Sequence, residues 1–454
     1  MNVGTILMIL FAICILISDK SKKVVGWRLF VFTIFISTFI NVCTAGKLGV
    51  VSITYSMVLQ MIFIVWSIAV KNFKLYWKDM GALALFGTSI IISYVLLILG
   101  KDTELVVPFD TSIDNVYSGK SIAIVPHFGA QQVSAMIVLF IFIVFLLMAK
   151  EYLIDKEWRD KSVNISIRIF RIYFIAIFVE FVINNFINEE LVRKIVTFIL
   201  GIPQDSVAYP QIRGGIYSVL TFFSEPSYAV VGIVYYLIMF TKQERTKKDI
   251  IWNIVGMMAL LSTSSGSAIV IIPFALVSTI WNGRFSLKKI KIRKQHLILW
   301  GGMVLLAICF MCFEYNAIYE LLKSINDKIV AYIVGTEAEK LSASGAIRKY
   351  GNELIYNVFF SQPLFGYGIG SARGYGVLPG MLGTMGIVGI YTYWRLMKSV
   401  FRIRLNEQSI FLLVVSCLYA TSVLSIWYIY EPMIILVFYA IKQCEQFELI
   451  KEGI

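Results

Sequence analysis

Long apolar runs, separated by short polar breaks, follow one another along most of the chain. Runs long enough to cross about 30 Å of hydrocarbon lie at 2–18, 29–44, 50–70, 80–99, 130–149, 168–187, 214–240, 250–264, 267–281, 297–313, 377–397, 409–425 and 428–441. We therefore predict an all-α fold, a polytopic membrane helix bundle of about 12 to 14 spans, formed by residues 1–454 as one transmembrane domain. Between the late spans, residues 314–376 predict a large external loop of two amphipathic helices followed by a glycine-rich stretch.

Composition and charge agree with a membrane protein. Of the 454 residues 58% are hydrophobic and 15% are charged, whereas a soluble domain has about 25% charged residues. The net charge of +13 is the difference between 41 Lys and Arg residues and 28 Asp and Glu residues, and 29 of the 41 basic residues fall on one side when alternate breaks between the spans are grouped. Because cytoplasmic loops concentrate basic residues, this asymmetry predicts an external N-terminus and a cytoplasmic C-terminus in the inner membrane. The excess charge is thus an orientation signal, with no nucleic acid implied.

Cysteine and histidine usage points to no metal or redox chemistry. The six cysteines predict no disulfide framework, and the pair Cys309 and Cys312 has no second ligand pair, so small buried hydrophobes are favoured. His127 and His296 are the only histidines, which argues against a histidine-based metal centre or a Ser-His-Asp triad. No metal and no cofactor are expected.

Carboxylates inside predicted spans are candidate site residues, since burial of a charge in lipid is costly unless it is paired or faces water. Glu225 lies in the segment FFSEPSY at 222–228, where Pro226 favours a helix start or a kink. A kink alone would not need a carboxylate. Glu180 shares a helix face with Asn184 and Asn188, a stripe that suits either the wall of a wet cavity or hydrogen bonds between helices.

Arginines on the predicted outer side are candidate phosphate ligands. Arg213, Arg348 and Arg373 each lie near glycine or proline at a junction between loop and membrane, and a guanidinium can hold a phosphate with two hydrogen bonds. Solvated arginines, or arginines on lipid headgroups, are the alternative for each one.

A glycine-rich segment, SQPLFGYGIGS at 361–371, precedes the span at 377–397. Gly366, Gly368 and Gly370 form a GxGxG run, but no strand precedes it and no GK[ST] follows, so a nucleotide loop is not indicated. Close approach of two backbones, or a tight turn into the next span, is favoured instead.

Several landmarks in order resemble the Wzy-type polysaccharide polymerases of O-antigen, capsule and exopolysaccharide assembly, which are related to the O-antigen ligases. They are FFSEPSY at 222–228, STSSGSA at 262–268, SGAIR at 344–348, QPLFGYGIG at 362–370 and LGTMG at 382–386. The chain departs from the family at Ser265, where many relatives have arginine. It also lacks the loop histidine expected of ligases, because no histidine lies between Glu314 and Gly386, which favours the polymerase branch.

The resemblance implies glycosyl transfer on the outer face of the membrane. A growing glycan would leave undecaprenyl diphosphate and join an incoming undecaprenyl-diphosphate-linked repeat unit. It implies Arg348 and Glu225 as catalytic residues, for the charge of the leaving diphosphate and for the acceptor proton. Arg213, Arg373, Gly366, Gly368, Glu180 and Asn184 are expected to bind substrate. A flippase, a chain-length-regulating co-polymerase and membrane lipid are the expected partners.

Two other functions stay open. A ligase would transfer finished polymer to a final acceptor. A flippase or transporter would account for the spans and the carboxylates in the membrane, but it predicts similar halves of the chain, which the sequence does not show, and it leaves the outer loop unexplained.

Overall fold

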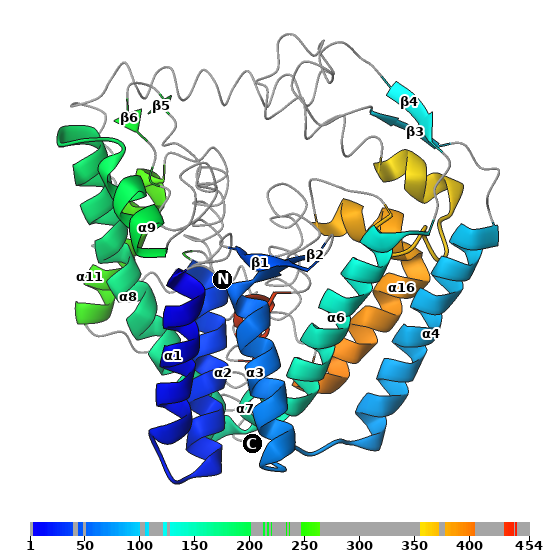
Figure 1. Cartoon of the computed structure of the whole chain (residues 1–454), viewed down its shortest axis with the longest axis horizontal. Helices are drawn as coiled ribbons and strands as arrows, with labels where there is room; N and C mark the ends of the chain where they lie inside the picture. Colours follow the sequence, from blue (N-terminus) through cyan, green and yellow to red (C-terminus); the bar gives the residue numbers. More distant parts are fainter. Residues whose placement is uncertain are drawn as a thin grey trace, which may run out of the picture.

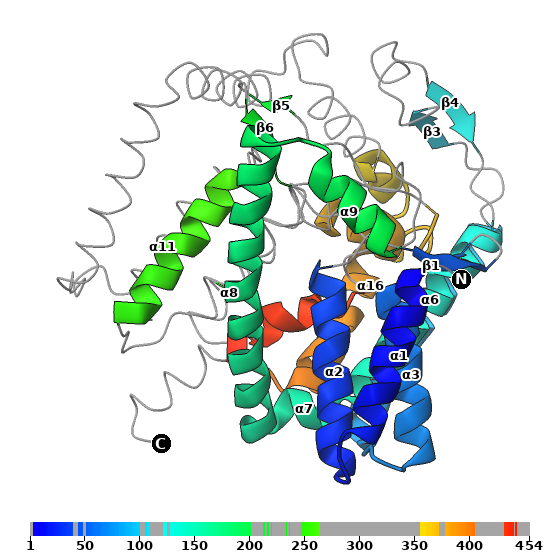
Figure 2. The same cartoon turned by 60° about the vertical axis from the view of Figure 1, so that its left-hand side comes forward.

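In a computed structural model of the chain, the residues that the structure describes are 3–39, 44–48, 51–99, 105–108, 121–124, 128–200, 212–213, 216–217, 219, 233, 236, 247–263, 355–371, 377–404, 431–439 and 441–442. Most of them are helical. The longer helices run side by side with alternating direction (Figures 1 and 2). The elements are α1 (Val3–Ile17), α2 (Lys22–Phe39), α3 (Tyr55–Ala69), α4 (Trp77–Leu99), α6 (Ala130–Met148), α7 (Lys150–Ile154), α8 (Lys156–Phe186), α9 (Leu191–Leu200), α11 (Lys247–Ser262) and α16 (Val377–Phe401).

The two ends of this helix array differ in structure and in charge. At one end, called the basic end, lie the turn 18–21, the connection 70–76, the segment 149–155 and residues 402–404 (Figure 1). Its described basic residues include Lys20, Lys22, Lys23, Arg28, Lys71, Lys74, Lys78, Lys150, Lys156, Arg159, Lys161, Arg402, Arg404 and Lys442. The opposite end, called the hairpin end, carries three β-hairpins, and the described basic residues there include Lys47, Arg193, Lys194 and Arg213.

The hairpins correct the all-α prediction in part. The strands pair antiparallel as β1 (Thr44–Leu48) with β2 (Val51–Thr54), β3 (Leu105–Pro108) with β4 (Ser121–Ile124), and β5 (Ile212–Arg213) with β6 (Ile216–Tyr217). The predicted spans 29–44 and 50–70 overlap β1 and β2. In the structure α2 ends at Phe39. Helix α3 begins at Tyr55, because the extended Thr54 caps it: the Thr54 side chain accepts a hydrogen bond from the Met57 N–H at 3.2 Å.

Other predicted spans match helices with shifted ends. The runs 80–99, 130–149 and 377–397 correspond to α4, α6 and α16. The run 168–187 is the second part of α8, which begins earlier because the Asp155 side chain accepts hydrogen bonds from the backbone N–H groups of Glu157 and Trp158. The first part of α8 is rich in charged residues and lies at the basic end.

The helices expose apolar side chains and bury small polar side chains within a largely apolar core. In α4, the exposed side chains include Leu85, Ile91 and Leu99, whereas Ser89 and Ser93 are buried. Buried Thr33, Ser37, Thr38, Ser56, Gln60, Ser67, Thr384 and Thr392 repeat the pattern in other helices. Among the described helices α4 is the one that is both long and apolar enough to cross a membrane, with a mean hydropathy of 2.4 over its best window. Its length, about 35 Å at 1.5 Å per residue, exceeds the hydrocarbon thickness.

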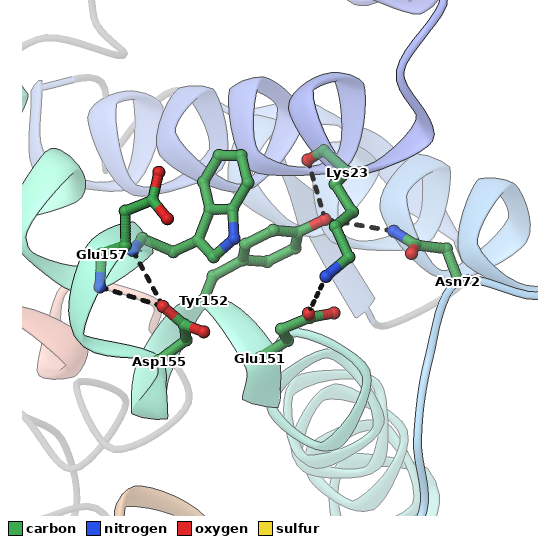
Figure 3. A network of polar contacts seen from close by, with 7 residues as sticks. Lys23, Asn72, Glu151, Tyr152, Asp155 and Glu157 are labelled. Carbon is green, nitrogen blue, oxygen red and sulfur yellow. Dashed lines mark hydrogen bonds and ion pairs between the residues drawn. The ribbon is translucent and has the colours of Figure 1, made fainter.

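A polar network joins α2, α7 and the connection 70–76 at the basic end (Figure 3). Lys23 Nζ lies 2.5 Å from Glu151 Oε1, and the Tyr152 hydroxyl donates to the Lys23 carbonyl and accepts from the Asn72 amide, both at 3.1 Å. The hydrogen bond to Glu151, and then its charge, raise the pKa of Lys23. Burial raises the pKa of Tyr152 to about 12, although the bond from Asn72 acts in the opposite direction.

A buried ion pair fixes the start of α4 against α7 and the end of α16. The Lys150 ammonium is bonded to the Asp79 carboxylate, and both side chains are almost fully buried. Ser399 Oγ donates to Asp79 Oδ1 at 2.6 Å, and the Lys150 ammonium lies 4.7 Å from the centroid of the Tyr76 ring. Burial lowers the pKa of Lys150, and the bond and charge of Asp79 oppose this.

Candidate functional site

The glycine-rich segment 363–370 fills a break in α16. Helical geometry is interrupted at Gly386, which has φ 62° and ψ −175°. On one side of the break, the carbonyls of Pro363 and Leu364 accept hydrogen bonds from the N–H groups of Ile387 and Val388, at 3.0 and 2.9 Å. The N–H groups released by the interrupted helix therefore find partners in the glycine-rich segment.

On the other side of the break, the glycine-rich segment supplies the N–H donors and α16 supplies the carbonyl acceptors. The N–H groups of Tyr367 and Gly368 donate to the carbonyls of Gly383 and Thr384, at 3.2 and 2.9 Å. Four backbone hydrogen bonds thus join the segment to α16 across the break. In a helix within lipid, irregular backbone is tolerated only where protein or a water-filled cavity surrounds it, and here the protein surrounds it.

Glycine is favoured at four positions of this arrangement, one of which is Gly370 with a φ of 89°. Gly366 and Gly368 have φ values of 65° and 86°, and Gly386 is also left-handed, a region that other residues enter at a cost. A Cβ on Gly366 would lie 2.5 Å from the backbone carbon of Thr384, and a Cβ on Gly368 would lie 2.6 Å from the Tyr94 ring. The predicted close approach of backbones is confirmed.

Helix α4 holds the segment from its other side. The Tyr94 hydroxyl donates to the Ile369 carbonyl at 2.7 Å, and Ser93 Oγ donates to the Gly366 carbonyl at 3.3 Å. Both side chains are buried. The apolar run 80–99 gave no reason to single out these two residues, although a serine and a tyrosine side by side in a lipid-length helix are a signal for contacts between helices.

The N–H groups of Gly366 and Gly368 are used within the protein, by the carbonyls of Gln362 and Thr384 at 3.0 and 2.9 Å. Both glycines are buried. The structure gives them a packing role, and their contact with substrate stays a prediction.

The polar stripe of α8 divides into two parts. Glu180 and Asn184 are buried, with 4% and 3% of their surfaces exposed, on the face that also carries Phe170, Phe174 and Ile177. Asn188 is exposed, and its side chain accepts a hydrogen bond from the Glu190 N–H at 2.9 Å in the turn between α8 and α9. The opposite face of α8 is apolar and exposed, with Ile172, Ile175, Val179, Val182 and Phe186. The carboxylate therefore faces protein.

Asn185 connects this part of α8 to the hairpin that carries Arg213. Its amide oxygen accepts from the Tyr217 N–H at 2.8 Å, and its amide nitrogen donates to the Tyr217 carbonyl at 3.2 Å. Tyr217 lies in β6, and Arg213 in β5 pairs with Ile216 of β6. The Asn185 side chain thus acts as donor and as acceptor, and it fixes the β5–β6 hairpin to the end of α8 (Figure 2). Asn185 is not part of the predicted stripe of Glu180, Asn184 and Asn188, yet it is the residue that joins α8 to this hairpin.

The remaining predicted site residues, Glu225, Arg348 and Arg373, lie outside the described residues. The chain leads from Arg348 into the helix 355–361, where Ile355 and Val358 are buried, and Arg373 follows two residues after Ser371. The predicted external loop 314–376 is described from residue 355 to 371. Downstream of Glu225 on the same predicted span, Tyr236 packs its ring against Phe174 of α8 at a centroid distance of 4.8 Å.

No cluster of three or more His, Cys, Asp and Glu side chains suited to a metal ion occurs among the described residues. Comparisons with protein families, with curated proteins and with solved structures find no match for this chain.

Proposed function

We propose that the chain is a polysaccharide polymerase of the inner membrane, a polytopic helix bundle of about 12 to 14 spans formed by residues 1–454, with the 314–376 loop outside. It transfers a growing glycan from undecaprenyl diphosphate to an undecaprenyl-diphosphate-linked repeat unit at the outer face. Its partners are these lipid-linked oligosaccharides, membrane lipid, a flippase and a chain-length regulator.

Two features of the helix array support a membrane location. The exposed faces of α4 and of the second part of α8 are apolar, where a soluble protein has polar side chains, and small polar side chains lie buried between the helices, as is typical of helices in lipid. Of the connections predicted to be cytoplasmic, the described ones at 18–21, 70–76 and 149–155 lie together at the basic end (Figure 1). Concentration of Lys and Arg at one end agrees with a cytoplasmic side there, and with an external N-terminus.

The observation that carries the proposal is the fixed backbone of the glycine-rich segment. PLFGYGIG is one half of the motif pair, SEP and PLFGxGxG, that is most distinctive in the family resemblance, and it is bonded to both sides of the break in α16. In the sequence, PLFGYGIG begins 15 residues after Arg348 and ends three residues before Arg373. Arg213 lies in a hairpin that Asn185 fixes at the hairpin end. A fixed hairpin suits an arginine that is to stabilise developing charge without reorganisation.

The proposed reaction balances without a cofactor. The acceptor hydroxyl oxygen forms a bond with the anomeric carbon of the donor glycan as the bond from that carbon to the diphosphate oxygen breaks. Glu225 takes the hydroxyl proton, and Arg348, with Arg213 and Arg373, stabilises the negative charge of the departing undecaprenyl diphosphate. Glu180 and Asn184 support the substrate-binding region from α8.

Complementation of a deletion strain tests the proposal. Arg348→Ala and Glu225→Gln should abolish long polymer at unchanged membrane abundance, whereas Arg404→Ala, at the basic end, should leave it intact. Normal polymer ladders from either site variant would overturn the site assignment. Lipid-linked glycans of the deletion strain separate the functions: single repeat units outside support a polymerase, repeat units trapped inside a flippase, and long polymer still on undecaprenyl diphosphate a ligase.

A further inference from the structure

Helix α9 has an outward face of large apolar side chains. Leu191, Ile195, Phe198 and Ile199 recur at helical spacing and are exposed, Phe198 by 85%. The inner face is mixed: Arg193 and Thr197 are 4% and 3% exposed, and Val196 and Leu200 are buried beside them. A helix on a water-covered surface would instead turn a polar face outward.

Helix α9 bridges α8 and α1 at the hairpin end (Figure 2). It follows α8 after the turn that Asn188 closes, and an ion pair of 2.6 Å between Glu190 and Lys194 lies at its start. Its last residue reaches α1, because a Cβ on Gly4 would lie 3.1 Å from the Leu200 carbonyl oxygen. Both ends of this short helix are thereby fixed to the bundle.

The apolar face of α9 continues two exposed apolar surfaces. Phe186 and Ile187, at the end of α8, are 78% and 68% exposed. On α1 the exposed apolar side chains include Val3, Leu7 and Phe11. If the sides of α1 and α8 contact lipid, as the proposed function requires, the same medium covers the outward face of α9.

We infer that α9 is an interfacial helix whose face of Leu191, Ile195, Phe198 and Ile199 is embedded in the outer leaflet of the bilayer. The inference rests on the proposed membrane location. The bilayer suits this face because one medium would cover α1, α8 and α9 together. The charged pair Glu190 and Lys194 marks where the helix meets water, as in amphipathic helices that lie in the plane of the membrane. Burial of Arg193 on the inner face keeps its charge out of lipid.

Fluorescence quenching in vesicles tests the inference on the full chain. In a variant without the six native cysteines, single cysteines at Phe198, Ile199, Val179 or Lys161 carry an environment-sensitive dye, and the protein is reconstituted in phosphatidylcholine and phosphatidylglycerol. We expect a quencher attached high on the acyl chain to reduce emission at least about twofold more at 198 and 199 than at 161, where aqueous iodide should quench instead.

The control positions separate the two possible failures. Val179 lies on the exposed apolar face of α8 and should be quenched by a probe deep in the acyl chains. If 179 responds in this way while 198 and 199 respond only to iodide, the inference about α9 is overturned and the membrane location stands. If 179 also responds only to iodide, the membrane location itself fails. Disulfide formation between copies through Phe198→Cys, without lipid quenching, would overturn the inference in favour of a second chain.

Discussion

Gly366 packs against the backbone at Thr384, two residues before Gly386, and Gly386 packs against the backbone at Leu364, two residues before Gly366. Each glycine has a left-handed φ, and a Cβ on Gly386 would lie 2.5 Å from the carbonyl carbon and oxygen of Leu364, just as a Cβ on Gly366 would meet Thr384. The break in α16 and the turn of the glycine-rich segment therefore depend on one close approach of two backbones.

Alanine at either position should destabilise the protein by about 2 to 4 kcal/mol, because backbone strain and overpacking add. Thermal unfolding of the purified protein in detergent measures the effect. Gly87→Ala is the matched control: nothing lies within 4 Å of a Cβ there, so it should be neutral or slightly stabilising. Equal melting temperatures of Gly366→Ala, Gly386→Ala and Gly87→Ala would contradict the described packing.

The buried pair of Lys150 and Asp79 predicts an asymmetric mutational response. Asp79→Ala should cost about 3 to 5 kcal/mol because it leaves a buried ammonium without its counter-charge, and the double variant Asp79→Leu, Lys150→Met should cost much less. The exposed pair Glu157 and Lys161, 2.6 Å apart, is the control, and Glu157→Ala should change stability by about 0.5 kcal/mol at most. Similar losses at the two pairs would argue against burial of the first.

Tyr152 predicts a stability loss at alkaline pH. Its pKa is raised from 10.0 to about 12, so its contribution is complete below pH 10 and is lost as pH rises through about 12. The full difference corresponds to roughly 2 to 3 kcal/mol. Tyr152→Phe should therefore lose less stability than the parent protein over this range in detergent, whereas Tyr356→Phe, at an exposed tyrosine, should follow the parent curve. Parallel curves for Tyr152→Phe and the parent would refute the assignment.

Because Asn185 holds the β5–β6 hairpin that carries Arg213, its replacement should reduce polymer synthesis. Asn185→Leu removes both hydrogen bonds to Tyr217 and should free the β5–β6 hairpin, lowering polymer yield and average chain length at normal membrane abundance. Each lost bond contributes about 1 kcal/mol, so the helices should stay folded. Glu189→Ala, an exposed neighbour, serves as the control. Parent-like polymer from Asn185→Leu would show that the hairpin needs no such anchor.

The sequence was sufficient for the apolar helices and for the glycine contacts. Spans 80–99 and 377–397 correspond to α4 and α16 because length and apolar composition specify a helix in both. The hairpin of β1 and β2 was missed because apolar content alone does not separate a short strand from the end of a span, although glycines and β-branched residues at 44–54 were a usable signal.

The break in α16 could not be predicted as a structure. Gly386 is one of 31 glycines, and its geometry depends on carbonyls that arrive from residues 363 and 364. The hydrogen bonds between Asn185 and Tyr217 could not be predicted either, because the two residues are 32 positions apart in the sequence and meet only in the folded chain. Patterns with a helical period report which face a residue occupies, but they carry no information about what lies opposite.

The contact of α4 with α16 has a consequence for the order of events during synthesis. Ser89 is bonded to Thr392, 303 positions later, at 2.9 Å. At about 5 to 20 residues per second, roughly 15 to 60 s pass between translation of the two residues. During that time α4 lacks its contact with α16. The two helices can therefore pack together only near the end of synthesis. A nascent chain halted before residue 377 lacks Thr392, so a cysteine placed at Ser89 should be open to labelling in that chain and protected in the full-length protein.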